Sequence, residues 1–404
     1  MLGIAAMPAL TRLYEPSDFA ALNIFSQVVA GLAILMTLRF EYLVMQPADQ
    51  TESDRVLRLT CLLGALNVVW LTPLLSVLPS YWSWLQRQGE IADWLWLAPI
   101  SALALSLAVG LQQAVQRRGD FKTSAVSEFC GRCAYVASAL LGALALSNIA
   151  GLMLSSLANA GGKLAWLFNA GRDLPQAVWR PGRIPVSRSV CQMAWSTSAS
   201  SLISLVSGFA PMIFIADRYG ANALGQYGLV IATLYLPGAL LGQAIGQVYF
   251  QRACRLHGAG LGFTSIVIET SGNLAKVGVP LYTLIAIVSP IAYPLVFGAQ
   301  WASAGEIARW LCLASLAAFI STPLDRTSIV TSVWWYLSAW HIMRAVMTVT
   351  TLVISVKLAL SFEAFILLLS IQNAGAYCID WGASYMFSVR AASLRKHDGT
   401  RIDS

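Results

Sequence analysis

The chain has 404 residues, of which 57% are hydrophobic and 11% charged, and its formal net charge is +7. Soluble domains carry roughly 25% charged residues. This composition therefore excludes a cytosolic enzyme, a secreted disulfide scaffold and a disordered chain, and it indicates a polytopic membrane protein.

A membrane-spanning helix needs about 20 mostly apolar residues. Candidate spans lie at residues 19–38, 57–78, 92–114, 123–144, 147–170, 190–216, 222–250, 265–297, 303–324, 331–357 and 362–389. The apolar residues 1–10 cover about half a span and lack the flanks of a secretory signal, so we expect them to end a truncated first helix. The sequence therefore predicts an all-α polytopic membrane protein with about twelve transmembrane helices.

The basic residues predict the orientation of these helices. With a first helix that starts inside, 17 of the 26 lysines and arginines fall in inner segments and four in outer loops. Such an excess is the positive-inside pattern, and it places the C-terminus in the cytoplasm. Because the basic residues are scattered over short loops, they explain the net charge without a nucleic-acid-binding surface.

The longest loop divides the chain into two halves. We expect an N-terminal six-helix bundle at 1–170, a basic cytoplasmic linker at 171–189, a C-terminal six-helix bundle at 190–390 and a cytoplasmic tail at 391–404. Arg12-Leu-Tyr14 and Arg218-Tyr219 occupy the first outer loop of their respective halves, a weak internal repeat. Parallel repeats of this kind are a known transporter plan, so we expect pseudo-two-fold symmetry.

Motifs for enzymatic chemistry and metal binding are missing from the sequence. The pair Cys130 and Cys133 has no second pair or histidine cluster nearby, and there is no phosphate-binding G-x-x-x-x-G-K loop. We expect no metal and no cofactor. The glycines Gly238, Gly242 and Gly246 form a tandem G-x-x-x-G, which favours close helix packing.

Charged residues near the middle of the spans are the candidate functional groups. A cation at that depth costs about 2.5–3.5 kcal/mol, and a water-filled cationic cavity that binds an anion would account for it. Lys163 and Arg344 are the first candidates, because neither has an opposite charge at helical spacing, and Lys276 and Arg132 follow. Glu128 lies four residues before Arg132, so these two are expected to pair.

Two further charged residues, Arg309 and Asp380, lie nearer the ends of spans and are expected to reach the membrane interface. Two acidic side chains, Glu128 and Glu269, are candidates for coupling to a proton or sodium gradient.

Several segments, in this order, resemble one family. They are residues 10–20 (LTRLYEPSDFA), 38–41 (LRFE), 116–121 (QRRGDF), 225–228 (GQYG), 236–237 (LP), 246–250 (GQVYF) and 297–305 (FGAQWASAG). Together they resemble the bacterial polysaccharide-biosynthesis flippases, the O-antigen (Wzx-type) and exopolysaccharide transporters of the multidrug/oligosaccharidyl-lipid/polysaccharide (MOP) exporter superfamily. The truncated first helix is the one departure.

The resemblance implies a flippase in the bacterial cytoplasmic membrane. Its substrate would be an undecaprenyl-pyrophosphate-linked oligosaccharide, moved from the inner to the outer leaflet by alternating access, and its partners would include polymerase or export machinery. It also implies that Arg12 and Arg39, which match basic positions flanking the first two helices, lie at the mouth of the path.

Two alternatives stay open. A drug or cation antiporter of the same superfamily should have mainly acidic residues in its cavity, whereas the mid-span charges here lean positive. A membrane enzyme of polysaccharide assembly needs a sizeable outer loop with catalytic residues, and the longest outer loop, at about residues 79–91, is short and mostly aromatic.

Overall fold

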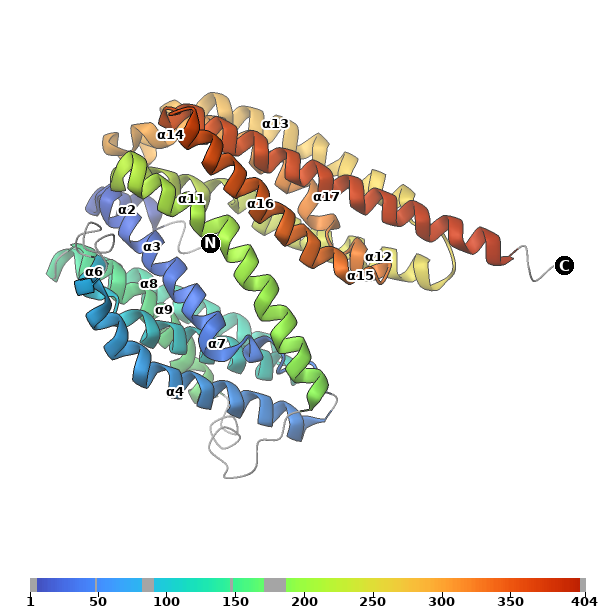
Figure 1. Cartoon of the computed structure of the whole chain (residues 1–404), viewed down its shortest axis with the longest axis horizontal. Coiled ribbons are helices and arrows are strands. Elements are labelled where there is room, and N and C mark those ends of the chain that lie inside the picture. The colour runs from blue at the N-terminus through green and yellow to red at the C-terminus, as the bar shows by residue number, and fades with distance from the viewer. Residues whose placement is uncertain (1–5, 48, 82–90, 146–147, 171–186, 400–404) are drawn as a thin grey trace. The chain divides into compact units, whose positions relative to one another are not determined.

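The computed structural model describes residues 6–47, 49–81, 91–145, 148–170 and 187–399 (Figure 1). All regular structure within these ranges is helical. The chain divides into two compact units, Met1–Gly225 and Gln226–Ser404. The expected bounds of bundles, linker and tail stay a prediction, and most of the 171–189 linker lies outside the described residues.

The first unit is a bundle of long helices. Its elements are α2 (Met7–Leu13), α3 (Pro16–Thr37), η1 (Phe40–Tyr42), α4 (Gln50–Tyr81), α6 (Ile91–Trp94), α7 (Leu97–Arg117), α8 (Phe121–Ala145), α9 (Asn148–Ala170) and most of α11 (Arg188–Leu234). Apolar side chains from η1, α4, α7, α9 and α11 pack into a buried cluster, which includes Phe40, Leu57, Leu111, Leu167 and Val190.

The second unit is also helical. Its elements are η2 (Gly238–Gly242), α12 (Gln243–Gly258), α13 (Thr264–Phe297), η3 (Ala299–Trp301), α14 (Ala302–Ser321), η4 (Thr322–Leu324), α15 (Thr327–Val330), α16 (Trp335–Lys357) and α17 (Phe362–Gly399). A buried cluster that includes Tyr249, Phe263, Val267 and Leu324 joins α12, α13 and η4.

Two interruptions of helical structure fall where the weak repeat predicts outer loops. Tyr14 and Glu15 have extended backbone and separate α2 from α3, and a capping box between Glu15 and Asp18 starts α3. In α11 the backbone leaves the helix at Gly220, whose φ of 91° is one that glycine adopts readily. A break in the helix therefore falls at the end of Arg12-Leu-Tyr14 and directly after Arg218-Tyr219.

The span predicted at 222–250 is interrupted. Pro237 has no N–H to donate, so the helix that continues from Gly220 ends at Leu234. The π-helical turn η2 then leads into α12. The other predicted spans each overlap a described helix, although 92–114 includes the turn between α6 and α7 and 190–216 is the first part of α11.

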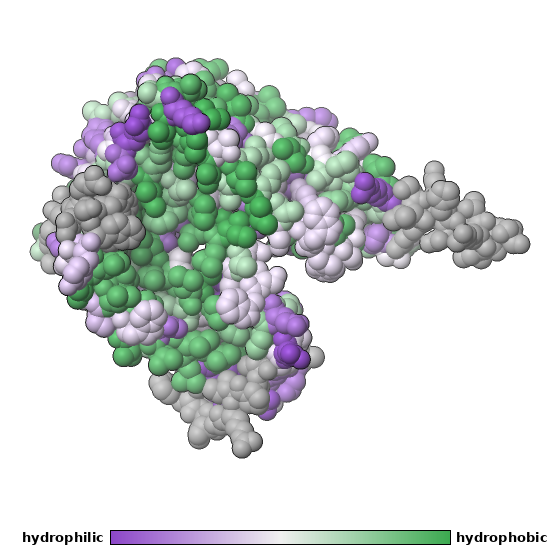
Figure 2. All heavy atoms as spheres, viewed as in Figure 1, coloured by the Kyte–Doolittle hydropathy of each residue, from purple (hydrophilic) through white to green (hydrophobic). Residues whose placement is uncertain are grey.

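Eight described segments are long and apolar enough to cross a membrane: Pro16–Thr37, Gln50–Tyr81, Leu97–Arg117, Arg188–Leu234, Thr264–Phe297, Ala299–Val330, Trp335–Lys357 and Phe362–Ala391. Many of their exposed side chains are apolar, such as Val69 and Ile291, and hydrophobic residues cover much of the face in Figure 2. Since water would not tolerate so much apolar surface, these faces contact lipid. The count of twelve spans and the pseudo-symmetry stay predictions.

Helices α8 and α9 are not among those eight segments, and they pack very closely. A Cβ added at Gly142 would clash with the Cα of Gly151. A Cβ at Gly162 would lie 2.9 Å from the carbonyl oxygen of Cys130. Both helices also carry charged groups, Glu128, Arg132 and Lys163, which lower their hydropathy and turn out to belong to a polar site.

Candidate functional site

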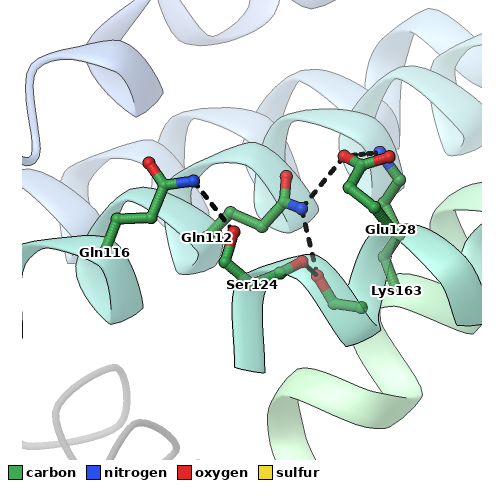
Figure 3. Close-up of polar contacts among 6 residues, drawn as sticks. Gln112, Gln116, Ser124, Glu128 and Lys163 are labelled. Atoms are coloured by element: carbon green, nitrogen blue, oxygen red, sulfur yellow. Dashed lines mark hydrogen bonds and ion pairs between the residues drawn. The ribbon is translucent and has the colours of Figure 1, made fainter. Parts of the chain in front are cut away.

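The first site is a polar network within the first unit, shown in Figure 3. The Nζ of Lys163, on α9, lies 2.6 Å from Oε1 of Glu128, on α8. Gln112, on α7, donates hydrogen bonds of 3.0 Å to Glu128 Oε1 and to Ser127 Oγ. Three helices therefore meet at one ammonium–carboxylate pair.

This pair is unequally buried. The side chain of Lys163 is 10% exposed, whereas that of Glu128 is 46% exposed. The carboxylate therefore keeps one side open while the ammonium is enclosed. Because the ammonium of Lys163 is the more buried partner, a ligand that reached this pair would first meet the Glu128 carboxylate and the neighbouring Arg132, which is exposed.

A glycine on α8, Gly131, leaves the space that the side chain of Lys163 occupies. A Cβ added at Gly131 would lie 2.6 Å from Cγ of Lys163 and 2.8 Å from the backbone oxygen of Asn159. No real Cβ makes such contacts, so this position is glycine because α9 and the stem of Lys163 occupy that space.

The expected pairings need correction. Lys163 is not unpaired, because Glu128 from the preceding helix neutralises it. Glu128 pairs with Lys163 and not with Arg132, which forms no ion pair with any described residue. Residues four apart share a helix face, but a partner on a tightly packed neighbouring helix comes closer.

The second site lies within the second unit around Arg344, on α16. Its guanidinium carbon is 5.7 Å from the ring centroid of Trp340 and 5.4 Å from that of Tyr377, both within range for cation–π attraction. Its Nε is buried without a hydrogen-bond partner, as is Nδ1 of His341. Within the described ranges no carboxylate lies within ion-pair distance of Arg344.

The remaining candidates are spread over the two units. Lys276 on α13 and Arg12 on α2 are both exposed. Glu269, on α13, receives two 3.3 Å hydrogen bonds from Arg252, on α12. The structure therefore does not bring these three residues together with Lys163 or with Arg344 inside one unit's site.

Arg39 belongs to a separate cluster in the first unit. It lies 3.8 Å from Glu41, donates to Ser201 Oγ at 3.3 Å, and sits 4.8 Å from the ring centroid of Tyr42. Leu38 and Arg39 both have positive φ, 49° and 60°, which turns the chain sharply after α3.

Glu41 belongs to the LRFE segment, but sequence reasoning gave it no functional role. It is 1% exposed and accepts a 2.6 Å hydrogen bond from Thr37 Oγ1. Burial raises its pKa above the ordinary 4.5, and the Thr37 hydrogen bond and the Arg39 charge oppose this only in part. An acidic residue two positions after a basic one, just past a helix end, was the available signal.

Asp380, expected at the interface, is instead buried at 3% exposure. Ser321 Oγ donates to one carboxylate oxygen at 2.7 Å and the Tyr336 hydroxyl to the other at 3.0 Å. Arg309, by contrast, is exposed and pairs with Glu306 at 3.1 Å. Near a span end, hydroxyl donors on adjacent helices hold an acidic group inside.

The glycines of the tandem G-x-x-x-G differ in their surroundings. A Cβ at Gly246 would lie 3.4 Å from Cα of Pro323, and one at Gly242 would lie 3.7 Å from Cγ of Pro323. The space around Gly238 is open. Two of the three glycines thus face η4, and the described residues hold no group of three potential metal ligands.

The chain is similar in structure to several membrane transporters. The chain is similar over 98% of its length to the inward-facing conformation of a multidrug resistance MATE family transporter of the MOP superfamily, covering 95% of it (TM-score 0.76, 13% identity). It is also similar to the lipid II flippase MurJ in its inward closed conformation, over 98% of this chain and 91% of MurJ (TM-score 0.67, 10% identity).

A third similar structure is a MOP superfamily transporter from Pyrococcus furiosus, described as having a binding pocket of reverse polarity that suggests a different function. The likeness covers 96% of this chain and 92% of the other (TM-score 0.68, 12% identity). At these identities the comparisons show the fold alone, a multi-pass membrane protein with the MATE-like fold.

The sequence family is more specific. Residues 9–306 match the family described as polysaccharide biosynthesis protein, which is well over half of the chain. The chain therefore belongs to this family, and the resemblance read from its motifs is confirmed. A comparison with curated protein sequences finds no match.

Proposed function

We propose that the protein translocates an undecaprenyl-pyrophosphate-linked oligosaccharide, an O-antigen or exopolysaccharide repeat unit, from the inner to the outer leaflet of the bacterial cytoplasmic membrane. The observation that carries the proposal is the family match over residues 9–306 on a transporter fold that a lipid II flippase also has. About twelve spans and alternating access between two bundles complete the proposal.

Arg344 is the group best suited to the anionic headgroup. Its charge is held against two aromatic rings, its Nε has no hydrogen-bond partner, and no carboxylate pairs with it among the described residues. A pyrophosphate would supply the missing acceptor, and guanidinium–phosphate contacts are strong and geometrically specific.

Lys163 takes a different role from Arg344, because Glu128 already neutralises it. To reach Lys163, the pyrophosphate of the substrate would have to displace the Glu128 carboxylate. Alternatively, Arg132, which lies beside Glu128, would bind the pyrophosphate first. Arg12 and Arg39 are assigned to the mouths of the path, Arg39 on the inner side and Arg12 on the outer side, and Lys276 stays a candidate for the cationic cavity. Outward movement of two negative charges from a negative interior releases about 5 kcal/mol per 100 mV, from roughly 2.3 per charge.

The two acidic residues expected to couple an ion gradient both sit in ion pairs, Glu128 with Lys163 and Glu269 with Arg252. Uptake of a proton or sodium ion at either carboxylate requires that its pair opens. Coupling at these sites would therefore link ion binding to a movement of α8 against α9, or of α12 against α13.

The test measures glycan export in the native host after the gene has been deleted and each variant has been expressed in its place. Relative to the wild-type gene, Arg344→Gln is expected to lower export about tenfold to a hundredfold, since a hydrogen bond to a charged group contributes about 1.5–3 kcal/mol. Arg309→Gln is the matched control, because Arg309 is an exposed span arginine with its own partner, Glu306. It should export normally.

Intact export with Arg344→Gln and Lys163→Met combined, at normal protein levels, would remove both residues from the headgroup site. Export that persists without the gene would refute the flippase itself. A drug or cation antiporter, the alternative favoured by the MATE likeness, predicts instead that expression raises resistance to cationic dyes in an exporter-deficient strain.

A further inference from the structure

A row of polar and aromatic contacts joins α16 to α17, which pack against each other in the second unit (Figure 1). Tyr336, Trp340 and Arg344 follow one another at four-residue spacing, so they share one face of α16. On α17, Tyr377 and Asp380 are about one helical turn apart and contact that face. The two helices therefore meet here through aromatic rings and charged groups.

Each step along this row is a direct contact. The hydroxyl of Tyr336 donates to a carboxylate oxygen of Asp380 at 3.0 Å. The ring centroids of Trp340 and Tyr377 lie 5.9 Å apart. The guanidinium carbon of Arg344 lies 5.4 Å from the ring centroid of Tyr377. Asp380 and Arg344 thus occupy neighbouring places in one row, and both are next to Tyr377.

Asp380 and Arg344 are opposite charges, and neither has an ion partner among the described residues. Asp380 is 3% exposed, and its hydrogen-bond donors are the hydroxyls of Ser321 and Tyr336. Arg344 is half-buried, and its Nε has no hydrogen-bond partner. The two charges are close enough to attract each other across the row. Asp380 is therefore the counter-charge of Arg344 when no ligand is bound.

The other ionisable groups nearby leave this assignment intact. His341 lies in the same turn of α16 as Arg344, and its Nδ1 is buried without a hydrogen-bond partner. It is a second nitrogen base and supplies no negative charge. Asp325 interacts electrostatically with Asp380 and with its own neighbour Arg326. The acidic group that acts on Arg344 is therefore Asp380.

We propose that Asp380 sets the affinity of Arg344 for the anionic headgroup by remaining beside it as a fixed negative charge. The inference rests on the proposed function, in which Arg344 binds the pyrophosphate. A bound pyrophosphate is attracted by Arg344 and repelled by Asp380, so the carboxylate weakens binding. As in ion pathways, the ligand must also be able to leave, and limited affinity favours its release.

Binding of farnesyl diphosphate to the purified full chain in phosphatidylcholine nanodiscs tests the proposal, with farnesol as the uncharged probe. Asp380→Asn removes the charge and keeps an oxygen that accepts a hydrogen bond. It should bind the diphosphate about threefold to tenfold more tightly, since nearby charges in a protein interact through an effective dielectric constant of about 20. Its affinity for farnesol should not change. A packing defect would weaken binding of both probes, so the sign of the effect separates charge from structure.

Three further variants locate the effect. Glu363→Gln is the matched control, because it neutralises an exposed acid on the same helix about 25 Å from Asp380, and it should bind as the wild type does. Ser321→Ala removes a hydrogen bond to Asp380 but keeps its charge, and it should also bind normally. Arg344→Gln should bind the diphosphate more weakly. Without Arg344 the diphosphate is not held near Asp380, so adding Asp380→Asn should then change the affinity by less than about twofold.

All variants are checked for an unchanged elution volume and melting temperature. Asp380→Ser, which is also neutral, replaces Asp380→Asn if the asparagine variant does not fold. Unchanged or weaker diphosphate binding in a folded neutral variant would overturn the proposal. So would equal tightening of farnesol binding, or tightening of diphosphate binding that persists without Arg344.

Failure of this inference is distinguishable from failure of the proposed function, because diphosphate binding is measured without export. If Arg344→Gln alone weakens binding and Asp380→Asn does not tighten it, only the role of Asp380 is refuted. If Arg344→Gln leaves binding unchanged, the headgroup site at Arg344 is refuted and this inference with it. Export that persists without the gene refutes the flippase and leaves the measured link between Asp380 and Arg344 in place.

Discussion

The Glu128–Lys163 contact puts an ammonium group with 10% exposure next to a carboxylate with 46% exposure. Removing the carboxylate in Glu128→Gln leaves an enclosed cation without its counter-charge, and this is the costly way to break a buried pair. Removing both charges in Glu128→Gln with Lys163→Met should recover part of the loss.

A double-mutant cycle on melting temperature in detergent measures this coupling. We expect an interaction free energy of about 1 kcal/mol, reduced from the fully buried case because water reaches Glu128. The control pair is Arg309 with Glu306, which is exposed on both sides and should couple more weakly. Additive effects of the two changes at Glu128 and Lys163 would contradict a direct pair.

This pair marks the limit of sequence reasoning at the residue scale. The two residues are 35 positions apart, so no helical spacing connects them. The sequence identified both as charged groups within spans. Only the close approach of α8 to α9, set by small residues such as Gly142 and Gly151, decides that they meet.

Glu41 gives a prediction for the pH dependence of stability. It lies in the segment between α3 and α4, and burial raises its pKa above the ordinary 4.5. The folded protein therefore holds this proton more tightly than the unfolded chain does. The resulting contribution to stability is present at low pH and is lost as the pH rises from the unfolded pKa through the folded one.

Glu41→Gln removes the titration and keeps an acceptor for the hydroxyl of Thr37. Its melting temperature relative to the wild type should therefore increase as the pH is raised from about 4 to 7, across and above the ordinary carboxyl range. Parallel curves for the two proteins over this range would show that Glu41 titrates as it does in the unfolded chain.

At the scale of elements, hydropathy and length were enough to place the helices. The predicted 265–297 became α13 (Thr264–Phe297), and 362–389 lies within α17 (Phe362–Gly399). The predicted span at 222–250 was less accurate, because a hydropathy window averages over Pro237 and the π-helical turn that follows it. Backbone hydrogen bonding, which an average over side chains does not contain, decides such breaks.

The contact of α8 with α9 is tested by glycine substitutions in one helix. Gly151→Ala should destabilise the protein and lower its folded yield, because the Cβ would lie 2.7 Å from the Cα of Gly142 and would force two backbones apart. Overpacking of this kind typically costs about 1–3 kcal/mol, and more where backbone must move.

Gly161→Ala is the matched control on α9, where an added Cβ meets nothing within 4 Å. It should be neutral or stabilise the protein by up to about 1 kcal/mol, since alanine favours a helix more than glycine. Fluorescence-detected size exclusion and melting temperature compare the two variants. Equal melting temperatures would mean that the close backbone contact contributes nothing to stability.

For the whole molecule, the sequence identifies which cations lie within spans, and the fold decides which of them are neutralised. The mid-span cations have different surroundings: within the first unit Lys163 is paired with Glu128, whereas within the second unit Arg344 packs against two aromatic rings and Lys276 is exposed. The sequence could identify a class of residue and a family, but which cation is neutralised depends on tertiary contacts. The search for the headgroup site therefore starts from Arg344.

The number of membrane crossings is a property of the whole chain, and two reporter positions decide it. The turn at Gly119–Asp120 separates α7 from α8, and the turn at Leu360–Ser361 separates α16 from α17. If only the eight apolar segments cross the membrane, four crossings separate the two turns and both face the same side. The twelve-span arrangement places seven crossings between them and puts them on opposite sides.

Three features favour the twelve-span arrangement. Lys163 of α9 pairs with Glu128 of α8, and Gln112 of α7 donates to the same carboxylate, so these charged groups need not prevent α8 and α9 from crossing the membrane. Gly220 divides α11 into two segments. The basic residues Arg117, Arg118 and Lys122 flank the first turn, as expected of an inner loop.

Fusions of green fluorescent protein and of alkaline phosphatase at the two turns test this. At residue 120 the fluorescent fusion should be fluorescent and the phosphatase fusion inactive, and at residue 360 the reverse is expected. The same side for both positions would rule out the twelve-span arrangement.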